Sequence, residues 1–208
     1  MEIISHRGYW KSSDEKNTNV AFDRSFIGQF GTETDIRDFN GDLVISHDIA
    51  DSNSISVEEF LKCYNKYNCS GTLALNVKAD GLQEKIKKQL EAHEIKNYFF
   101  FDMSIPDTIG YMNANLNFFS RQSEYESIPA FYEKCNGIWL DAFIDIWFDE
   151  TLITKHLTNG KIVALVSPEL HKRDQISFWK MLKDAELHLK ENIILCTDLP
   201  EHATKFFD

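Results

Sequence analysis

The chain has 208 residues, of which 43% are hydrophobic, and its 33 acidic and 22 basic residues give a formal net charge of −11 at pH 7. This length suits a single domain spanning 1–208 with a sizeable hydrophobic core. The negative charge argues against nonspecific binding to nucleic acid or to an anionic membrane. It does not exclude a small anionic ligand, because a bound cation or a local arginine can reverse the sign of a pocket.

Short apolar segments rich in β-branched or aromatic residues alternate with amphipathic segments, which predicts alternating strands and helices. The predicted strands are Glu2–Ser5, Thr32–Ile36, Leu73–Val77, Tyr98–Phe101, Leu116–Ser120, Gly137–Leu140, Lys161–Val166 and Asn192–Cys196. The predicted helices are Val20–Phe30, Val57–Lys66, Leu82–His93, Pro106–Asn113, Ile128–Lys134, Asp149–Leu157, Ile176–Leu187 and Glu201–Phe207.

Two local features refine this pattern. Asp42–Ser46 alternates in polarity after an Asn-Gly turn and predicts a short additional strand that leads to His47. Ser56 precedes Glu59 by three residues, which predicts a capping box at the start of the second helix.

Eight strands that alternate with eight helices favour an α/β fold of the single-domain (β/α)8 TIM barrel type. The alternative is an open doubly wound sheet, but the first turn lacks the GxGxxG pattern typical of that fold. In a barrel the active site lies at the carboxyl ends of the strands. Polar residues lie at or near those ends: His6, Arg7, Glu33, Asp35, Asn76, Lys78, Asp102, Arg121, Asp141, Ser167, Thr197 and Asp198.

The N-terminal segment has neither a basic region nor a long apolar stretch of the kind found in secretion signals, and no segment approaches the ~18 apolar residues of a membrane span. The four cysteines lack CxxC spacing, which favours reduced thiols, although Cys63 and Cys69 could pair in an exported protein. We therefore expect a soluble cytoplasmic protein without stable membrane association. The oligomeric state is left open.

Glu33 and Asp35 are two residues apart on a predicted strand, so their side chains project to the same face. Two buried carboxylates repel each other unless they are paired, and a hard divalent cation such as Mg²⁺ or Ca²⁺ resolves this repulsion. The structural alternative is an ion pair with Arg37 or another base.

Two histidines, His6 and His47, lie close to these carboxylates along the chain. Taken alone, each is more typical of a hydrogen-bonded structural histidine. Together, a neutral imidazole and an imidazolium can act as the base and the acid of phosphodiester cleavage. Among the remaining histidines only His171 is kept as a marginal candidate, and the others are expected at the surface: His93, His156, His188 and His202.

Two cations complete the candidate site. Arg7 carries a planar guanidinium that matches two phosphate oxygens, although it could instead pair with Glu33 or Asp48. Lys78 ends an otherwise apolar strand, where a cation suits a phosphate or a metal-bound carboxylate. A lysine at a barrel rim can also simply extend its ammonium group into water.

Several of these residues fall into a recognisable series. The series is Ile-Ser-His6-Arg7-Gly8, Asn17-Thr18-x-x-Ala21-Phe22, Glu33-Thr-Asp35, Asn40-Gly41-Asp-Leu-Val, His47-Asp48 and Cys196-Thr197-Asp198-Leu199-Pro200, and it resembles the glycerophosphodiester phosphodiesterase family. The resemblance implies a (β/α)8 barrel that cleaves glycerophosphodiesters with one divalent cation, Mg²⁺ or Ca²⁺ with Mn²⁺ as a further option. It also implies His6 and His47 as the acid–base pair, Arg7 as a phosphate ligand, and Glu33 and Asp35 as metal ligands.

The chain departs from this family pattern at two positions. Lys16 stands where the family usually has glutamate, and Asn76, in Asn76-Val77-Lys78, stands where a glutamate completes the metal site. The carbonyl oxygen of Asn76 can still bind Mg²⁺ or Ca²⁺, but it brings no charge. Asp102, after the following strand, is a candidate for a compensating ligand.

The expected reaction is cleavage of a small phosphodiester to a phosphomonoester and an alcohol, with a cyclic phosphate first if a substrate hydroxyl attacks. One alternative is a catalytically impaired, ligand-binding barrel descended from such enzymes, which the changes at Lys16 and Asn76 favour. Another is a phospholipase-type lyase that releases the cyclic phosphate. The alcohol released is left open.

Overall fold

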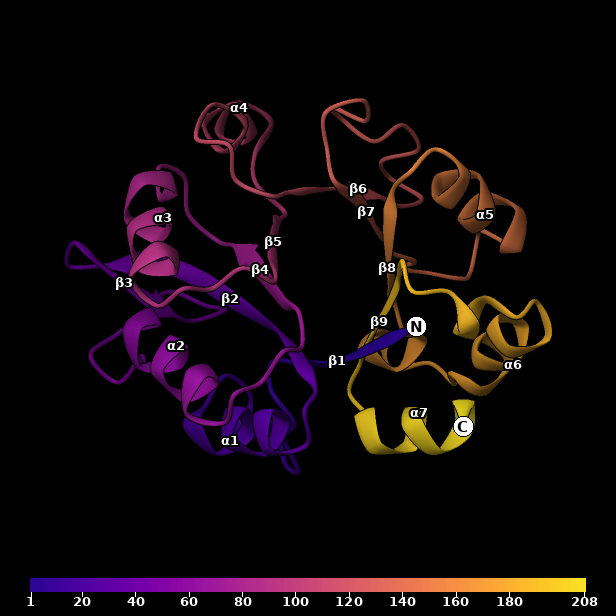
Figure 1. Ribbon diagram of the computed structural model, residues 1–208, viewed down its shortest axis with the longest axis horizontal. Coiled ribbons are helices and arrows are strands. Elements are labelled where there is room, and N and C mark those ends of the chain that lie inside the picture. The colour runs from indigo at the N-terminus through magenta and orange to yellow at the C-terminus, as the bar shows by residue number, and fades with distance from the viewer. The chain divides into compact units, whose positions relative to one another are not determined.

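The computed structural model describes all residues, 1–208, as two compact units. Ser5–Phe118 forms one, called here the N-terminal unit, and Met1–Ile4 with Phe119–Asp208 forms the other, the C-terminal unit. Strands and helices alternate throughout both units (Figure 1), which is the element order of the predicted (β/α)8 fold. None of the helices combines the length and apolar character needed to traverse a bilayer.

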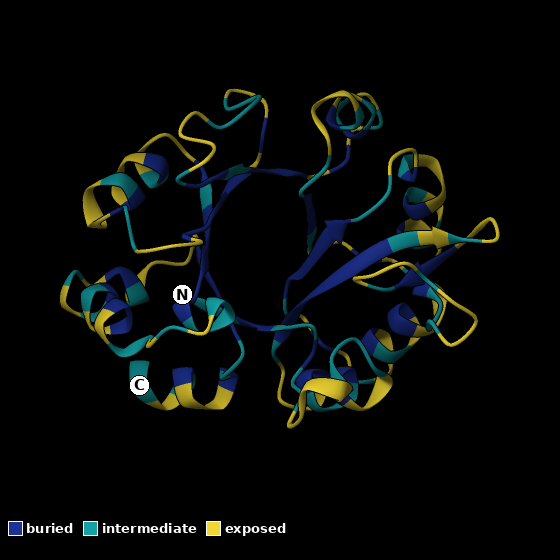
Figure 2. Cartoon of the chain, turned by 180° about the vertical axis from the view of Figure 1, so that it is seen from behind, coloured by how far each residue is buried: buried dark blue, intermediate teal, exposed yellow.

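The sheet of the N-terminal unit runs in the order β5 (Tyr98–Phe101), β4 (Leu73–Val77), β2 (Gly31–Phe39) and the end of β1 (Glu2–His6). The strands β2, β4 and β5 are parallel. The predicted additional strand is β3 (Asp42–Ile45), which folds back antiparallel onto β2. In Figure 2 the β2–β3 hairpin passes from a buried base to an exposed tip.

The helices of this unit are α1 (Asn19–Ile27), α2 (Val57–Lys66), α3 (Gln83–Ala92) and α4 (Ile105–Asn113), with the short 3₁₀ helix η1 (Ser13–Glu15) before α1. The predicted capping box is confirmed, because the Ser56 side chain accepts from the Glu59 amide while the Glu59 side chain accepts from the Ser56 amide. The rings of Phe22 and Phe26 from α1 pack on Phe60 from α2, with centroid distances of 4.7 and 5.8 Å. Burial of these rings holds both helices against the unit's core.

The sheet of the C-terminal unit runs from the first residues of β1 through β9 (Ile193–Thr197), β8 (Ile162–Val166) and β7 (Gly137–Leu140) to β6 (Phe119–Gln122). Its helices are α5 (Glu150–Thr158), α6 (Ile176–Asp184) and α7 (Pro200–Phe207), with the 3₁₀ turns η2 (Pro168–His171) and η3 (Leu187–Leu189). Trp179 of α6 is fully buried and packs on Phe206 and Phe207 of α7.

Several element predictions are wrong in part: the helix predicted at Val20–Phe30 ends at Ile27, and the strand predicted at Thr32–Ile36 continues to Phe39. The predicted helix Ile128–Lys134 is a series of turns, because Phe131 adopts a left-handed conformation with φ of 54° that no α-helix accommodates. The helix predicted at Ile176–Leu187 ends at Asp184, since Glu186 is also left-handed. The strand predicted at Leu116–Ser120 is shifted along the chain: it begins at Phe119 and ends at Gln122.

The prediction that His156 lies at the surface is also wrong. This side chain is 3% exposed, and its Nδ1 and Nε2 lie 2.9 Å from the Tyr132 hydroxyl and 2.8 Å from Gln122 Oε1. The Tyr132 hydroxyl comes from the turn segment that replaces the predicted helix. His156 therefore ties this segment to β6 and α5.

Candidate functional site

The turn after β1 places Arg7 and Gly8 beside the first residues of β2. Arg7 and Gly8 both have positive φ angles, of 57° and 81°. The Arg7 amide donates to the Glu33 carbonyl at 2.9 Å, and the Gly8 amide donates to Thr32 Oγ1 at 3.0 Å. A Cβ on Gly8 would lie 2.7 Å from the Ala21 Cβ, so glycine is required both by the backbone conformation and by the close approach of α1.

Glu33 and Asp35 project to one face of β2, as predicted, and both are almost completely buried. Asp35 is surrounded by donors. Arg7 Nε lies 3.1 Å from Asp35 Oδ2, and Lys78 Nζ lies 3.3 Å from Asp35 Oδ1. The predicted alternatives for Arg7, a pair with Glu33 or with Asp48, are thus replaced by a pair with Asp35.

Glu33 is less well compensated than Asp35. Its Oε2 lies 3.9 Å from His6 Nε2 and accepts no hydrogen bond. Burial and the nearby Asp35 carboxylate raise the pKa of Glu33 well above its usual value, although Arg7 and Lys78 act in the opposite direction. A further cation near this carboxylate, in addition to Arg7 and Lys78, would therefore stabilise its ionised form.

Asn76 lies next to these carboxylates because β2 and β4 pair in parallel with Asp35 opposite Asn76. Asn76 is buried, and its Nδ2 donates to Asp102 Oδ2 at 3.1 Å. Its carbonyl oxygen Oδ1 has no hydrogen-bond partner. Asp102 follows β5 directly and is left-handed, with φ of 64°.

Buried oxygens without hydrogen bonds are uncommon in folded proteins, and four of them lie on β2, on β4 and directly after β5: Glu33 Oε2, Asp35 Oδ1, Asn76 Oδ1 and Asp102 Oδ1. Carboxylate and amide oxygens are the ligands that Mg²⁺ and Ca²⁺ prefer. No group of three or more His, Cys, Asp or Glu side chains forms a metal cluster, so the amide of Asn76 is needed to complete a three-ligand set. With that amide included, the residues fit a hard divalent cation.

His47 stands apart from this buried group. It follows β3 on a loop that is attached to β2 by a 3.0 Å hydrogen bond from the Ser46 amide to the Asp35 carbonyl. Its side chain is half exposed, and its Nδ1 lies 2.8 Å from Asp48 Oδ1. Arg37, the predicted alternative partner of the carboxylate pair, instead donates to the carbonyl of Asp48.

Sequence reasoning assigned no role to Asn17, which the structure places against Asp35. Asn17 Nδ2 donates to Asp35 Oδ2 at 2.8 Å, and Asn17 Oδ1 accepts from Thr34 Oγ1 at 2.9 Å. Its position beside Thr18 in the recognised series was the available signal. The neighbouring Lys16 extends over the Trp10 ring, 4.5 Å from the centroid.

In the C-terminal unit, polar residues at strand ends pair with side chains of the loop after β6 and of the η2 turn. His171 Nε2 lies 2.7 Å from Asp141 Oδ1, and Arg121 forms an ion pair with Glu126. Thr197 donates to Glu169. These contacts assign structural partners to His171, the marginal catalytic candidate.

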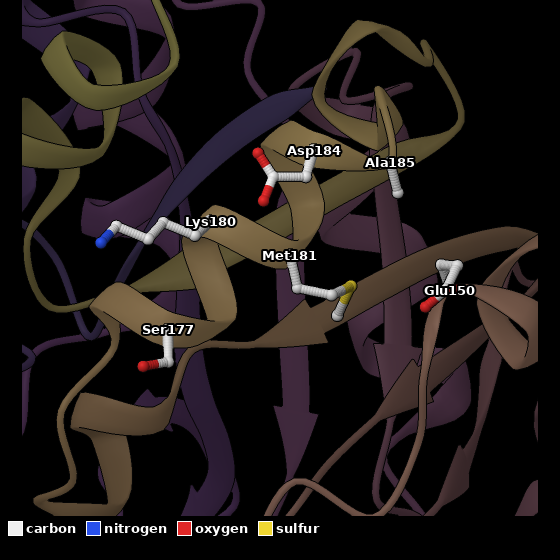
Figure 3. A pocket seen from close by; sticks show the side chains of 6 residues that line it. All are labelled: Glu150, Ser177, Lys180, Met181, Asp184 and Ala185. Carbon is white, nitrogen blue, oxygen red and sulfur yellow. The ribbon is translucent and has the colours of Figure 1, made fainter.

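A hollow of about 460 Å³ lies between α5 and α6, lined by Glu150, Ser177, Lys180, Met181, Asp184 and Ala185 (Figure 3). It contains no histidine and no buried carboxylate pair. The sequence-predicted acid–base candidates lie elsewhere, with His6 at the end of β1 and His47 after β3.

The fold and the site together define a (β/α)8 protein with a charged group at the carboxyl ends of neighbouring strands. No protein-family profile matches the chain, and no curated protein matches its sequence. Solved structures do match. They include a glycerophosphodiester phosphodiesterase from Agrobacterium tumefaciens, at TM-score 0.71 and 13% identity, covering 100% of this chain and 98% of that chain.

A glycerophosphodiester phosphodiesterase from Parabacteroides distasonis matches at TM-score 0.70 and 15% identity, covering 99% of this chain and 96% of that chain. An Oleispira antarctica phosphodiesterase in complex with the product sn-glycerol-3-phosphate matches at TM-score 0.71 and 16% identity, covering 100% and 97%. These matches span nearly the whole of each chain and confirm the (β/α)8 fold. The Agrobacterium tumefaciens and Parabacteroides distasonis structures also carry the name of the family that the sequence resembles.

Proposed function

We propose that the protein is a phosphoric diester hydrolase that cleaves a small glycerophosphodiester-like substrate to a phosphomonoester and an alcohol. One observation carries the proposal: the buried pair Glu33 and Asp35, with Arg7 and Lys78 both facing Asp35. Two buried carboxylates beside two cations are costly to hold without a ligand. A phosphate diester bound with a divalent cation satisfies all four groups, and the fold is one that glycerophosphodiester phosphodiesterases share.

Arg7 and Lys78 are assigned to the phosphate. Arg7 uses Nε to contact Asp35, which leaves its two terminal nitrogens for a bidentate contact with two phosphate oxygens. Lys78 Nζ contacts Asp35 Oδ1 and can turn to a phosphate oxygen when that carboxylate oxygen takes another partner. Asp35 thereby positions both cations before substrate arrives.

Glu33, Asp35 and Asn76 are assigned to one divalent cation, Mg²⁺ or Ca²⁺, with Mn²⁺ as a further option. Their buried oxygens without hydrogen bonds support the assignment. When bound, the cation would polarise the phosphoryl group and neutralise developing charge.

His6 and His47 are assigned to proton transfer. The contact of His47 Nδ1 with Asp48 favours the tautomer with its proton on Nδ1, which leaves Nε2 as a base. One histidine removes the proton of the attacking hydroxyl, and the other gives a proton to the departing alkoxide oxygen. If the nucleophile is a hydroxyl of the substrate itself, the first product is a cyclic phosphate.

The test is an assay of glycerophosphodiesters that differ in head group, with Mg²⁺, Ca²⁺ or Mn²⁺ and with EDTA. We expect cation-dependent turnover that falls by about 10²-fold or more in His6→Ala and in His47→Ala, as for the loss of a general acid or base. His202→Ala is the matched control, because this histidine is exposed on α7. Equal turnover by wild type and both site variants would contradict the acid–base assignment.

The neutral Asn76 favours a second candidate, a catalytically impaired barrel that binds such diesters without cleaving them. Saturable binding of the substrate panel by calorimetry, with no turnover under any cation, would support this candidate over the hydrolase. Phosphorus NMR of the products separates the hydrolase from a phospholipase-type lyase, because the lyase would accumulate a cyclic phosphate that the hydrolase opens to the monoester.

A further inference from the structure

The neutral residue in the proposed cation site is held in a defined orientation. Asn76 is 7% exposed, and its cross-strand neighbours are Asp35 on β2 and Phe101 on β5. Asp102, the residue after Phe101, accepts a hydrogen bond at Oδ2 from Asn76 Nδ2 at 3.1 Å. The contact therefore joins the ends of two adjacent strands.

An asparagine amide has one end that donates and one end that accepts, whereas an ionised carboxylate only accepts. A hydrogen bond to Asp102 is therefore possible only with the NH₂ group of Asn76 turned toward it. The reverse orientation would oppose the amide oxygen and a carboxylate oxygen in a buried site. Because the NH₂ group is directed at Asp102, Asn76 Oδ1 is directed elsewhere, and there it is buried with no hydrogen bond.

We propose that Asp102 is a positioning residue that turns the Asn76 amide so that Asn76 Oδ1 serves as a neutral third ligand of the cation. The inference rests on the proposed function for the presence of that cation. It assigns Asp102 a role different from that of a direct ligand: Asp102 Oδ2 accepts from the amide, whereas Asp102 Oδ1 is buried without a hydrogen bond, so the variants below are chosen to distinguish the two roles. Partners that orient a ligand in this way commonly change metal affinity by about 10–100-fold when removed.

The charges of the site agree with a neutral third ligand. Asp35 brings one negative charge and Glu33 brings a second when a bound cation stabilises its ionised form, while Arg7 and Lys78 bring two positive charges. A glutamate in place of Asn76 would put another carboxylate beside Asp102, where like charges repel in a buried environment. Asn76 and Asp102 therefore form a hydrogen-bonded pair of one amide and one carboxylate, which avoids this repulsion.

Two substitutions of Asp102 separate orientation from charge, and both tolerate its φ of 64°. Asp102→Asn removes the charge but keeps an oxygen that can accept from Asn76. Asp102→Gly removes both. Binding of Mn²⁺ alone to the metal-free full-length protein, followed by electron paramagnetic resonance and calorimetry, should weaken by about 10-fold or more in Asp102→Gly and by clearly less in Asp102→Asn.

A double-mutant cycle completes the test. If Asp102 acts through Asn76, then Asn76→Ala weakens Mn²⁺ binding and adding Asp102→Gly weakens it no further. Additive losses, or equal losses in Asp102→Asn and Asp102→Gly, would show that Asp102 acts by its charge or as a direct ligand and would overturn the inference. Circular dichroism and thermal melting establish that each variant is folded.

The metal measurement is independent of turnover. Wild-type protein that binds Mn²⁺ with the expected pattern among variants, but cleaves no phosphodiester, would refute the proposed function and leave the role of Asp102 intact. Wild-type protein that cleaves phosphodiesters without binding Mn²⁺ would overturn the role of Asp102 and its cation.

Discussion

Asn17 and Asp35 are joined by a 2.8 Å hydrogen bond from the side-chain Nδ2 of Asn17 to Asp35 Oδ2. The backbone N–H of Asn17 donates to the backbone carbonyl of Arg7 at 2.9 Å. One residue thus supports both the carboxylate and the turn that carries its cationic partner. Asn17 has a φ of 58°, a conformation that glycine and aspartate also adopt.

The first prediction concerns this contact. Asn17→Gly keeps the backbone but removes the donor to a buried charge, which should lower the free energy of unfolding by about 1–3 kcal/mol. Asn17→Asp should cost more, because it sets a carboxylate against Asp35. Urea unfolding measures both effects, and a smaller loss in Asn17→Asp than in Asn17→Gly would contradict the assigned contact.

The second prediction concerns the turn after β1. Gly8→Ala should destabilise the protein by about 2–4 kcal/mol, because it adds a left-handed backbone penalty to a Cβ placed 2.7 Å from Ala21 Cβ and 2.9 Å from Ala21 C. Gly41→Ala is a matched control. Gly41 also has positive φ but no atom within 4 Å of a Cβ, so it should lose only about 1 kcal/mol. Similar losses in the two variants would refute the role of the close approach to α1.

The third prediction concerns Glu33, whose folded-state pKa is raised by burial and by Asp35. A raised carboxyl pKa gives stability that is fully present below the ordinary value and is lost as pH rises through the folded value. Glu33→Gln cannot ionise, so it should melt at a higher temperature than metal-free wild type at pH 8 and at a similar temperature at pH 4. Thermal melts in EDTA measure the difference.

A cation adds a control to this comparison. Under the proposed function, Mg²⁺ should raise the melting temperature of wild type at pH 8 by more than that of Glu33→Gln, whose amide oxygen brings no charge to the site. A glutamine variant that is less stable than wild type in EDTA at pH 8 would show that Glu33 is ionised and compensated without a cation.

The fourth prediction concerns His156, where burial lowers the pKa to about 4. Its neutral ring can donate from Nε2 to Gln122 Oε1 while Nδ1 accepts from the Tyr132 hydroxyl. Below the ordinary histidine pKa of about 6.5 the unfolded chain binds the proton more strongly, so this group's contribution to stability falls as pH decreases from about 6.5 to about 4.

The measurement is the free energy of unfolding against pH. His156→Gln keeps a donor and an acceptor without titrating in this range, so its unfolding free energy should fall less steeply than that of wild type. His202→Asn, at an exposed position on α7, should retain the wild-type slope. A wild-type slope in His156→Gln would mean that other groups account for the pH dependence.

Local sequence patterns were sufficient for the parts of the molecule whose stabilising partners are close in the chain. The capping box of Ser56 and Glu59 joins residues three apart, and the shared face of Glu33 and Asp35 follows from the period of a strand. The turn segment predicted as the helix Ile128–Lys134 shows the limit of such patterns. There, Tyr132 pairs with His156, 24 residues away, and this contact replaces helix packing.

The sequence by itself determined the alternation of strands and helices, the residues at the strand ends, and the resemblance to phosphodiesterases. All of these depend only on residue type and on spacing along the chain. Only the tertiary structure decided which of those residues meet. Parallel pairing of β2 with β4 places Asn76 beside Asp35, and the turn before α1 brings Asn17 to the same carboxylate. The reason is physical: a hydrogen bond or ion pair depends on distance and direction in space, and neither is encoded by separation along the chain.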